Sequence, residues 1–109
     1  MGCLLHRWRY GEVFSPYNLP YEEMLYWHSY CSKFGVATTM SLSKSLTLMK
    51  DQKIRLATKI CRKCSKKMVA RVGFGLYCIP LRQYVNGWIE VEPTKQERRD
   101  IRLERLIGK

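Results

Sequence analysis

The sequence predicts a small, mostly α-helical protein with irregular segments, in which a degenerate zinc-knuckle module lies between short helices. Three observations predict this fold class. A chain of 109 residues forms one domain at most and buries only a modest core. Apolar residues recur at helical spacing in two stretches of the N-terminal half. Cys61 and Cys64 then form a Cys-x2-Cys pair, the spacing with which a tight turn presents two sulfurs to zinc.

The N-terminal part is expected to be an arm followed by helices. Residues 1–20 contain glycine, proline and several aromatic residues, and we interpret them as an extended N-terminal arm. Residues 21–60 form a helical segment. Its first helix spans 21–33, because Pro20 precedes an apolar pattern with acidic residues in the first turn. Its second helix spans about 42–58, where leucine, isoleucine, methionine and alanine recur at helical spacing.

The C-terminal part is expected to contain the knuckle and a last helix. Residues 61–91 form the knuckle core, with a short irregular strand pair, a turn and a short helix that begins at Pro80. Residues 92–109 form a basic C-terminal helix. Its start is marked by Thr94 and Glu97, which have the spacing of a capping box, where each side chain satisfies a backbone amide of the first turn.

The charge of the chain predicts a polyanionic partner. The formal net charge is +11, from 20 Lys and Arg residues against 9 Asp and Glu residues. The segment from Gln52 to Ile89 contains no acidic residue at all. A surface that serves only solubility mixes both signs of charge, whereas an acid-free basic stretch is typical of contact with phosphates. We therefore expect binding to nucleic acid.

The cysteines indicate an incomplete metal site. The chain has five cysteines, an odd number with no secretory signal before them, which favours thiols or metal ligands over disulfides. Cys61 and Cys64 supply two zinc ligands, and Cys78 is the candidate for a third. His28 and Cys31 share one face of the first predicted helix and are further candidates, but core packing explains them better. Zinc is thus the candidate cofactor, with a degenerate site.

The spacing after the cysteine pair carries a family resemblance. Cys61-Arg62-Lys63-Cys64 is followed by nine residues and then by Phe74-Gly75-Leu76. Leu81-Arg82-Gln83-Tyr84 comes next, and Leu25-Tyr26-Trp27 with Lys33-Phe34-Gly35 precedes the pair. Together these segments resemble the small ribosomal subunit protein 14 family. In that family a second Cys-x2-Cys pair follows the aromatic-Gly-Leu motif.

This chain departs from the family pattern at the second cysteine pair. If Leu81 and Arg82 set the register, the second pair falls on Tyr77 and Pro80, which cannot bind zinc, and Cys78 is one position away. The four-cysteine site is therefore broken or rebuilt. The eroded site and the extensions at both ends suggest an organellar, mitochondrial version of the family.

The resemblance implies a structural constituent of the small ribosomal subunit, placed in its head, acting in mitochondrial translation within the matrix. Its partners would be ribosomal RNA and neighbouring head proteins, with no membrane and no small-molecule substrate. Backbone contacts of this kind position a protein on RNA without reading sequence. The residues expected to contact the RNA are Arg55, Lys59, Arg62, Lys63, Lys66, Lys67, Arg71, Phe74 and Arg82.

Two other function classes stay open from the sequence. A free-standing zinc-knuckle RNA-binding protein would need a closed metal site. An accessory subunit of another mitochondrial assembly would show protein contacts instead of RNA contacts. An enzyme is not expected, because no pair of acidic residues suggests a cleft and neither histidine has a carboxylate partner nearby in sequence.

Overall fold

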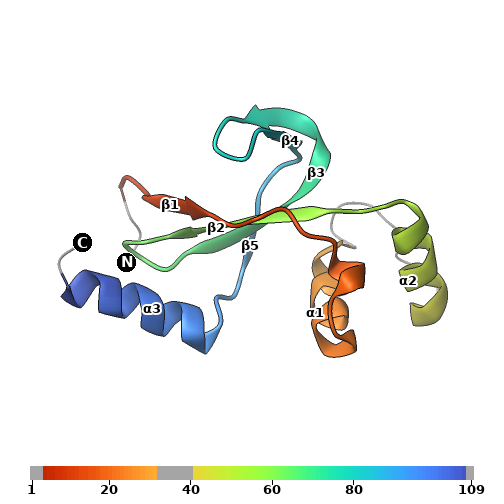
Figure 1. The fold of residues 1–109 in the computed structure, drawn as a ribbon, viewed down its shortest axis with the longest axis horizontal. Helices are drawn as coiled ribbons and strands as arrows, with labels where there is room; N and C mark the ends of the chain where they lie inside the picture. The colour runs from red at the N-terminus through yellow and green to blue at the C-terminus, as the bar shows by residue number, and fades with distance from the viewer. Residues whose placement is uncertain (1–3, 32–40, 108–109) are drawn as a thin grey trace.

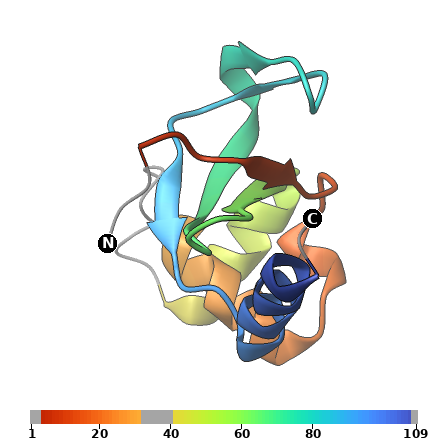
Figure 2. The same ribbon diagram turned by 90° about the vertical axis from the view of Figure 1, so that its left-hand side faces the viewer.

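The computed structural model describes residues 4–31 and 41–107, which form an antiparallel sheet with helices packed against it (Figure 1). The elements in chain order are β1 (Trp8–Tyr10), the 3-10 helix η1 (Pro16–Asn18), α1 (Tyr21–Cys31), α2 (Leu42–Asp51), β2 (Leu56–Cys61), β3 (Lys67–Cys78), β4 (Gln83–Val85), β5 (Ile89–Val91) and α3 (Lys95–Leu106). The strand order is β1-β2-β3-β4, and β5 pairs with β3. Figures 1 and 2 show α1, α2 and α3 on the same side of this sheet.

The prediction of a mostly α-helical fold is wrong, because the described residues form three α-helices and a five-stranded sheet. The main error lies in residues 42–58, predicted as one helix. α2 ends at Asp51, Lys53 has a left-handed φ of 53°, and the chain continues as β2. Leu56 and Ala57 are both fully buried, in core clusters on opposite faces of β2. A strand buried on both faces loses the apolar–polar alternation that identifies strands.

β3 is a strand of twelve residues, where a short irregular strand pair was predicted. Its first half pairs with β2 and its second half with β4. The register shifts between Val72 and Leu76, where Gly73 and Gly75 have φ values of 119° and 103°. A Cβ atom on Gly75 would collide with the carbonyl oxygen of Val85. β4 can therefore approach β3 only because residue 75 has no side chain.

The short helix predicted after Pro80 is also wrong. The chain makes a turn there and enters β4 at Gln83. The amide of Arg82 donates to the carbonyl of Ile79 at 3.1 Å, and Arg82 has a φ of 54°. A positive φ at a non-glycine residue interrupts a helix and suits a tight turn, so the proline starts a turn and not a helix.

Two helices begin where local signals predicted. α1 starts at Tyr21, directly after Pro20, and is described to Cys31; the last two positions of the predicted range lie outside the described residues. α3 has the predicted capping box. The amide of Glu97 donates to Thr94 Oγ1 at 3.1 Å, and the amide of Thr94 donates to Glu97 Oε1 at 2.8 Å. α3, Lys95–Leu106, lies within the segment 92–109 that was expected to form a basic C-terminal helix.

The sheet carries a core on each face. On the helix-covered face the buried residues are Trp27, Cys31, Met49, Ile54, Leu56, Val69 and Val91. On the opposite face, which we call the open face, they are smaller: Ala57, Ala70, Val72, Cys78 and Val85. Cys31 is therefore a core residue, as the sequence favoured. No helix within the described ranges is long and apolar enough to cross a membrane.

Candidate metal centre and nucleic-acid interface

The knuckle, residues 61–66, is the turn that joins β2 to β3. Cys61 ends β2, and its amide donates to the carbonyl of Lys66 at 2.8 Å. The amide of Ser65 donates back to the carbonyl of Cys61 at 2.9 Å, and Ser65 has a left-handed φ of 66°. These bonds close the turn on the two cysteines, so the sequence prediction of a knuckle at this pair agrees with the local geometry.

The N-terminal strand brings a third donor to the knuckle. β1 pairs with β2 so that Trp8 lies opposite Cys61, and the amide of Arg62 donates to the carbonyl of Arg7 at 2.8 Å. His6 is thereby held beside the turn, with its Nδ1 3.5 Å from Cys64 Sγ. The donor atoms of His6, Cys61 and Cys64 all lie within 4.8 Å of one another.

The environment of Cys61 favours its thiolate form. Burial on its own would raise the pKa of this thiol, but hydrogen bonds outweigh it. The backbone of Cys64, the His6 side chain and the backbone amides of Lys63 and Arg7 together lower the pKa to about 6. The Lys63 amide is 3.3 Å from Cys61 Sγ. The thiolate is the form of cysteine that binds metals.

Cys78 does not join this group. It is buried in the core of the open face, with Tyr10 packed against the same cluster. The predicted set of Cys61, Cys64 and Cys78 is therefore brought together only for its first two members, and His6 takes the third position. The sequence reasoning missed His6 because its partner is 58 residues away, and no local spacing links the two.

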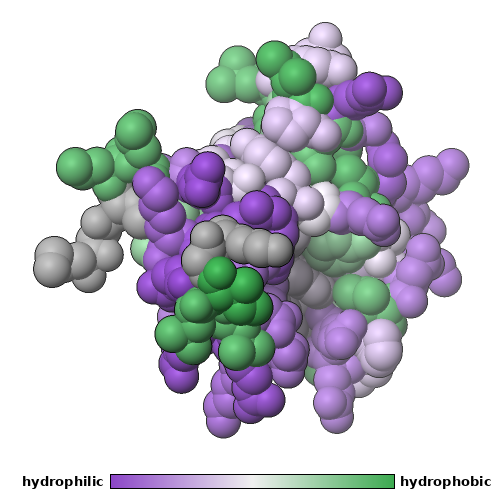
Figure 3. All heavy atoms as spheres, turned by 60° about the vertical axis from the view of Figure 1, so that its left-hand side comes forward, coloured by the Kyte–Doolittle hydropathy of each residue, from purple (hydrophilic) through white to green (hydrophobic). Residues whose placement is uncertain are grey.

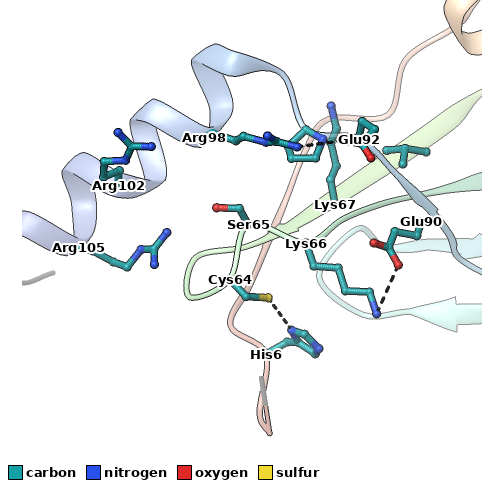
Figure 4. A pocket seen from close by; sticks show the side chains of 12 residues that line it. His6, Cys64, Ser65, Lys66, Lys67, Glu90, Glu92, Arg98, Arg102 and Arg105 are labelled. Carbon is teal, nitrogen blue, oxygen red and sulfur yellow. Dashed lines mark hydrogen bonds and ion pairs between the residues drawn. The ribbon is translucent and has the colours of Figure 1, made fainter. Parts of the chain in front are cut away.

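A basic groove of about 700 Å³ lies between the knuckle and α3 (Figure 4). Its charged lining comprises five cations and two carboxylates: Lys66, Lys67, Arg98, Arg102, Arg105, Glu90 and Glu92. His6 and Cys64 also line it. The three arginines recur at spacings of four and three residues, so they share one face of α3. The spacing of these arginines was visible in the sequence. That they face the knuckle across a groove was not.

The acidic residues neutralise only part of the basic groove. Arg98 pairs with Glu92 at 2.9 Å, and Lys66 lies 3.8 Å from Glu90. Arg102 and Arg105 have no acidic partner within the described part of the chain. Two guanidinium groups are thus available to an anion. Guanidinium groups bind phosphate oxygens through two parallel hydrogen bonds, which makes them well suited to this role.

The knuckle itself presents three of the predicted RNA-contacting cations. Arg62 and Lys63 are exposed, and Lys66 is half-buried at the basic groove. Arg62 lies 3.9 Å from Glu104, which Arg9 also contacts at 2.8 Å. These predicted contact residues share one end of the β2–β3 hairpin, so they can act together on one ligand.

Two of the residues predicted to contact RNA, Lys67 and Lys59, interact instead with side chains of the protein itself. Lys67 is only 7% exposed, and its Nζ lies 2.9 Å from Glu97 Oε1, which ties β3 to α3. Lys59 Nζ lies between two indole rings, 4.4 Å from the centroid of Trp8 and 4.3 Å from that of Trp88. Burial lowers the pKa of Lys59. We therefore place neither lysine in the phosphate-facing set.

The remaining predicted residues lie at the other end of the hairpin, which we call the far end. Arg55 precedes β2, and Arg71 lies opposite Leu56 in the register, with its guanidinium 5.2 Å from the Phe74 ring centroid. Arg82 is exposed in the turn before β4. The six residues of β2 span about 17 Å. The basic residues predicted from the sequence to form one RNA-contacting surface are therefore divided between the knuckle and the far end.

No family model, curated protein or solved structure was found to match this chain. The assignment of function therefore depends on the residues of the chain itself and on their arrangement.

Proposed function

We propose that this chain is an RNA-binding structural protein, and that its basic groove and knuckle bind the phosphate backbone of RNA. The observation that carries this proposal is the pair Arg102 and Arg105, which line the basic groove without an acidic partner among the described residues. Lys66 lines the same groove from the knuckle side, and Figure 4 shows the two walls facing each other.

The charge balance supports an anionic ligand for this groove. Cations that face one another across a groove repel, and the net charge of +11 adds to that repulsion. A bound phosphate backbone removes the repulsion and releases its own counterions, which drives binding at low salt. The role proposed is positioning on RNA and not catalysis, because phosphate contacts carry orientation without base-specific information.

The assembly we propose is the small ribosomal subunit of mitochondria, with ribosomal RNA and neighbouring head proteins as partners. The support for this finer step is the resemblance of Cys61-Arg62-Lys63-Cys64 and Phe74-Gly75-Leu76 to the small ribosomal subunit protein 14 family. The exposed cations of the knuckle fit the same role, since they lie on the motif that carries the resemblance.

The RNA-binding step is tested with a double variant of the groove, Arg102→Ala/Arg105→Ala, and a matched control at the far end, Arg55→Ala/Arg82→Ala. Both remove two positive charges from exposed positions. We expect the groove variant to weaken binding to a structured RNA by about tenfold or more at low salt, and to reduce the salt slope by about 1.4–1.8. The control should change both values much less. Equal losses from the two variants would contradict the proposal.

The assembly is tested separately, by sedimentation of the tagged chain from cell extracts. Co-migration with the small subunit is the expected result. Migration with other RNA in small particles would instead favour the free-standing zinc-knuckle protein, which the cluster of His6, Cys61 and Cys64 makes the second candidate. Migration with a large complex that lacks ribosomal RNA would indicate an accessory subunit of another mitochondrial assembly.

A further inference from the structure

We propose that His6, Cys61 and Cys64 bind one Zn²⁺ ion. This site differs from the cysteine set that the sequence pattern suggested, because it joins the N-terminal segment to the knuckle and leaves Cys78 out. It also stands apart from the RNA-binding proposal, since a metal can be counted in the purified chain with no RNA present.

The distances between donor atoms suit a tetrahedral zinc ion. Zinc lies about 2.3 Å from sulfur and about 2.0–2.1 Å from nitrogen, so tetrahedral ligands are separated by about 3.5 Å for a sulfur–nitrogen pair and about 3.8 Å for two sulfurs. Cys64 Sγ and His6 Nδ1 are already 3.5 Å apart. The largest separation within the group is no more than 4.8 Å, so a movement of about 1 Å would complete the geometry.

The surroundings of the donors are arranged to support them. The backbone amide of Lys63 lies 3.3 Å from Cys61 Sγ, where it can stabilise a bound thiolate. The His6 ring stacks on Trp8, with centroids 4.7 Å apart, which fixes the plane of the imidazole. Trp8 is itself held opposite Cys61 by the pairing of β1 with β2. The strand pairing therefore aims the histidine at the knuckle.

The site draws on three protein donors among the described residues. Cys31 and Cys78 are buried in core clusters, so they are not available as ligands. Zinc sites with three protein ligands take water or another bound donor in the fourth position.

The same side chains could instead form a catalytic cysteine and its base, and the geometry separates this alternative from a metal site. A cysteine beside a histidine can also act as a nucleophile activated by a base. Here a second cysteine, Cys61, lies within 4.8 Å of both Cys64 and His6, so the three atoms surround one point. A shared centre of three soft donors is the arrangement of a metal site. A nucleophile and its base would not require the third donor.

The test is metal content of the full chain, purified without chelator, together with the absorption spectrum of the Co²⁺-substituted protein. We expect about one Zn²⁺ per chain, and a cobalt spectrum with thiolate charge-transfer bands and intense tetrahedral d–d bands. His6→Ala and Cys64→Ser should each lower zinc affinity by about a hundredfold or more, and Cys64→Ser should also remove part of the thiolate absorption of the Co²⁺ form. Cys78→Ser is the matched control and should retain the metal.

The outcomes that overturn the proposal are specific. A wild-type chain with less than about 0.1 Zn²⁺, which also fails to take up Co²⁺, has no such site. Loss of zinc in Cys78→Ser with retention in His6→Ala would restore the ligand set suggested by the sequence. Full zinc affinity in both His6→Ala and Cys64→Ser would show that these residues do not form the site. Circular dichroism of the apo and metal-loaded forms shows whether a variant that lost metal had also failed to fold.

Discussion

The two ends of the β2–β3 hairpin have similar charge in the sequence but different surfaces in the structure. The knuckle end combines exposed cations with the basic groove and with three side chains whose donor atoms lie close enough together to hold a metal ion. The far end combines Arg55, Arg71 and Arg82 with five exposed apolar side chains, Phe74, Leu76, Tyr77, Ile79 and Tyr84. Figure 3 shows hydrophobic side chains gathered over the β3–β4 region at the top of the molecule, with hydrophilic ones over much of the part below.

Because of this difference, the proposed phosphate-binding surface is placed by how the cations are arranged and not by how many there are. At the far end Arg71 lies against an aromatic ring, and the neighbouring surface is apolar. At the knuckle end cations converge on one groove from two elements, and two arginines have no acidic partner in the described ranges. This convergence and the missing counter-charges are the reasons for placing the proposed RNA-binding surface at the knuckle end, and the two ends should respond separately to mutation.

The largest effect is expected from a change that breaks the far end alone. Gly75→Ala places a Cβ against the carbonyl of Val85 and also requires an unfavourable φ of 103°. We expect a loss of about 3 kcal/mol in the free energy of unfolding of the β3–β4 region. The control is Gly73→Ala, where φ is 119° but no atom lies within 4 Å of the added Cβ, so only the backbone strain remains. Urea denaturation measures both.

The two glycine variants also test whether the two ends of the hairpin act separately. A loss of stability at the far end should not reduce RNA binding at the knuckle end. Under conditions where Gly75→Ala remains folded, its affinity for RNA should stay within about twofold of wild type, since its site lies away from the groove. A loss of RNA affinity in Gly75→Ala as large as that of the groove variant would show that the two ends form one functional surface.

A smaller effect is expected where α3 is attached to the sheet. Lys67 is buried and pairs with Glu97, so Lys67→Met removes the cation from a partly buried carboxylate. We expect a cost of about 1–3 kcal/mol, and weaker RNA binding because α3 forms one wall of the groove. Thermal unfolding and RNA titration check the two expectations. An unchanged melting temperature would show that the pair does not hold α3 in place.

The same pair predicts a pH dependence. Burial by itself would raise the pKa of Glu97, but hydrogen bonds from Thr94 and Lys67 lower it below its ordinary value of 4.5. A depressed carboxyl pKa stabilises the fold above the unfolded-state pKa, and this stability is lost as the pH falls through the folded-state pKa. Glu97→Gln should therefore lose part of the acid sensitivity of wild type below pH 4.5. Parallel acid-unfolding curves for the two proteins would contradict this.

The smallest effect is expected for Lys59, whose ammonium group lies between Trp8 and Trp88. Lys59→Met should cost about 0.5–2 kcal/mol of stability through lost cation–π contacts. Its effect on RNA affinity should be smaller than that of Lys66→Met, which removes a cation from the groove wall. Titrations of the two single variants with the same RNA make this comparison directly. The reverse order would place Lys59 in the interface.

Local signals were sufficient for some elements. Pro20 and the Thr94–Glu97 capping box act within one helical turn, and both helices begin where these residues predict. The knuckle was likewise visible from Cys61 and Cys64, because both cysteines come from a single turn. These features depend on residues that are adjacent in sequence.

Features that depend on distant pairing could not be predicted. β2 was missed because burial on both faces hides its alternation, as Leu56 and Ala57 show. His6 was missed because only the pairing of β1 with β2 brings it to the knuckle. The periodicity of Arg98, Arg102 and Arg105 was readable, but their role depends on what α3 faces. The sequence could state the chemistry of these residues and not their arrangement.

The most direct test of the account is ultraviolet crosslinking of the full chain to bound RNA, with the crosslinked residues identified by mass spectrometry. If the knuckle and α3 bind RNA, crosslinks should form in the knuckle, residues 61–66, and in α3 between residues 98 and 105, with few in the far-end segment 72–85. Crosslinks concentrated in 72–85 and absent from the knuckle and α3 would contradict it.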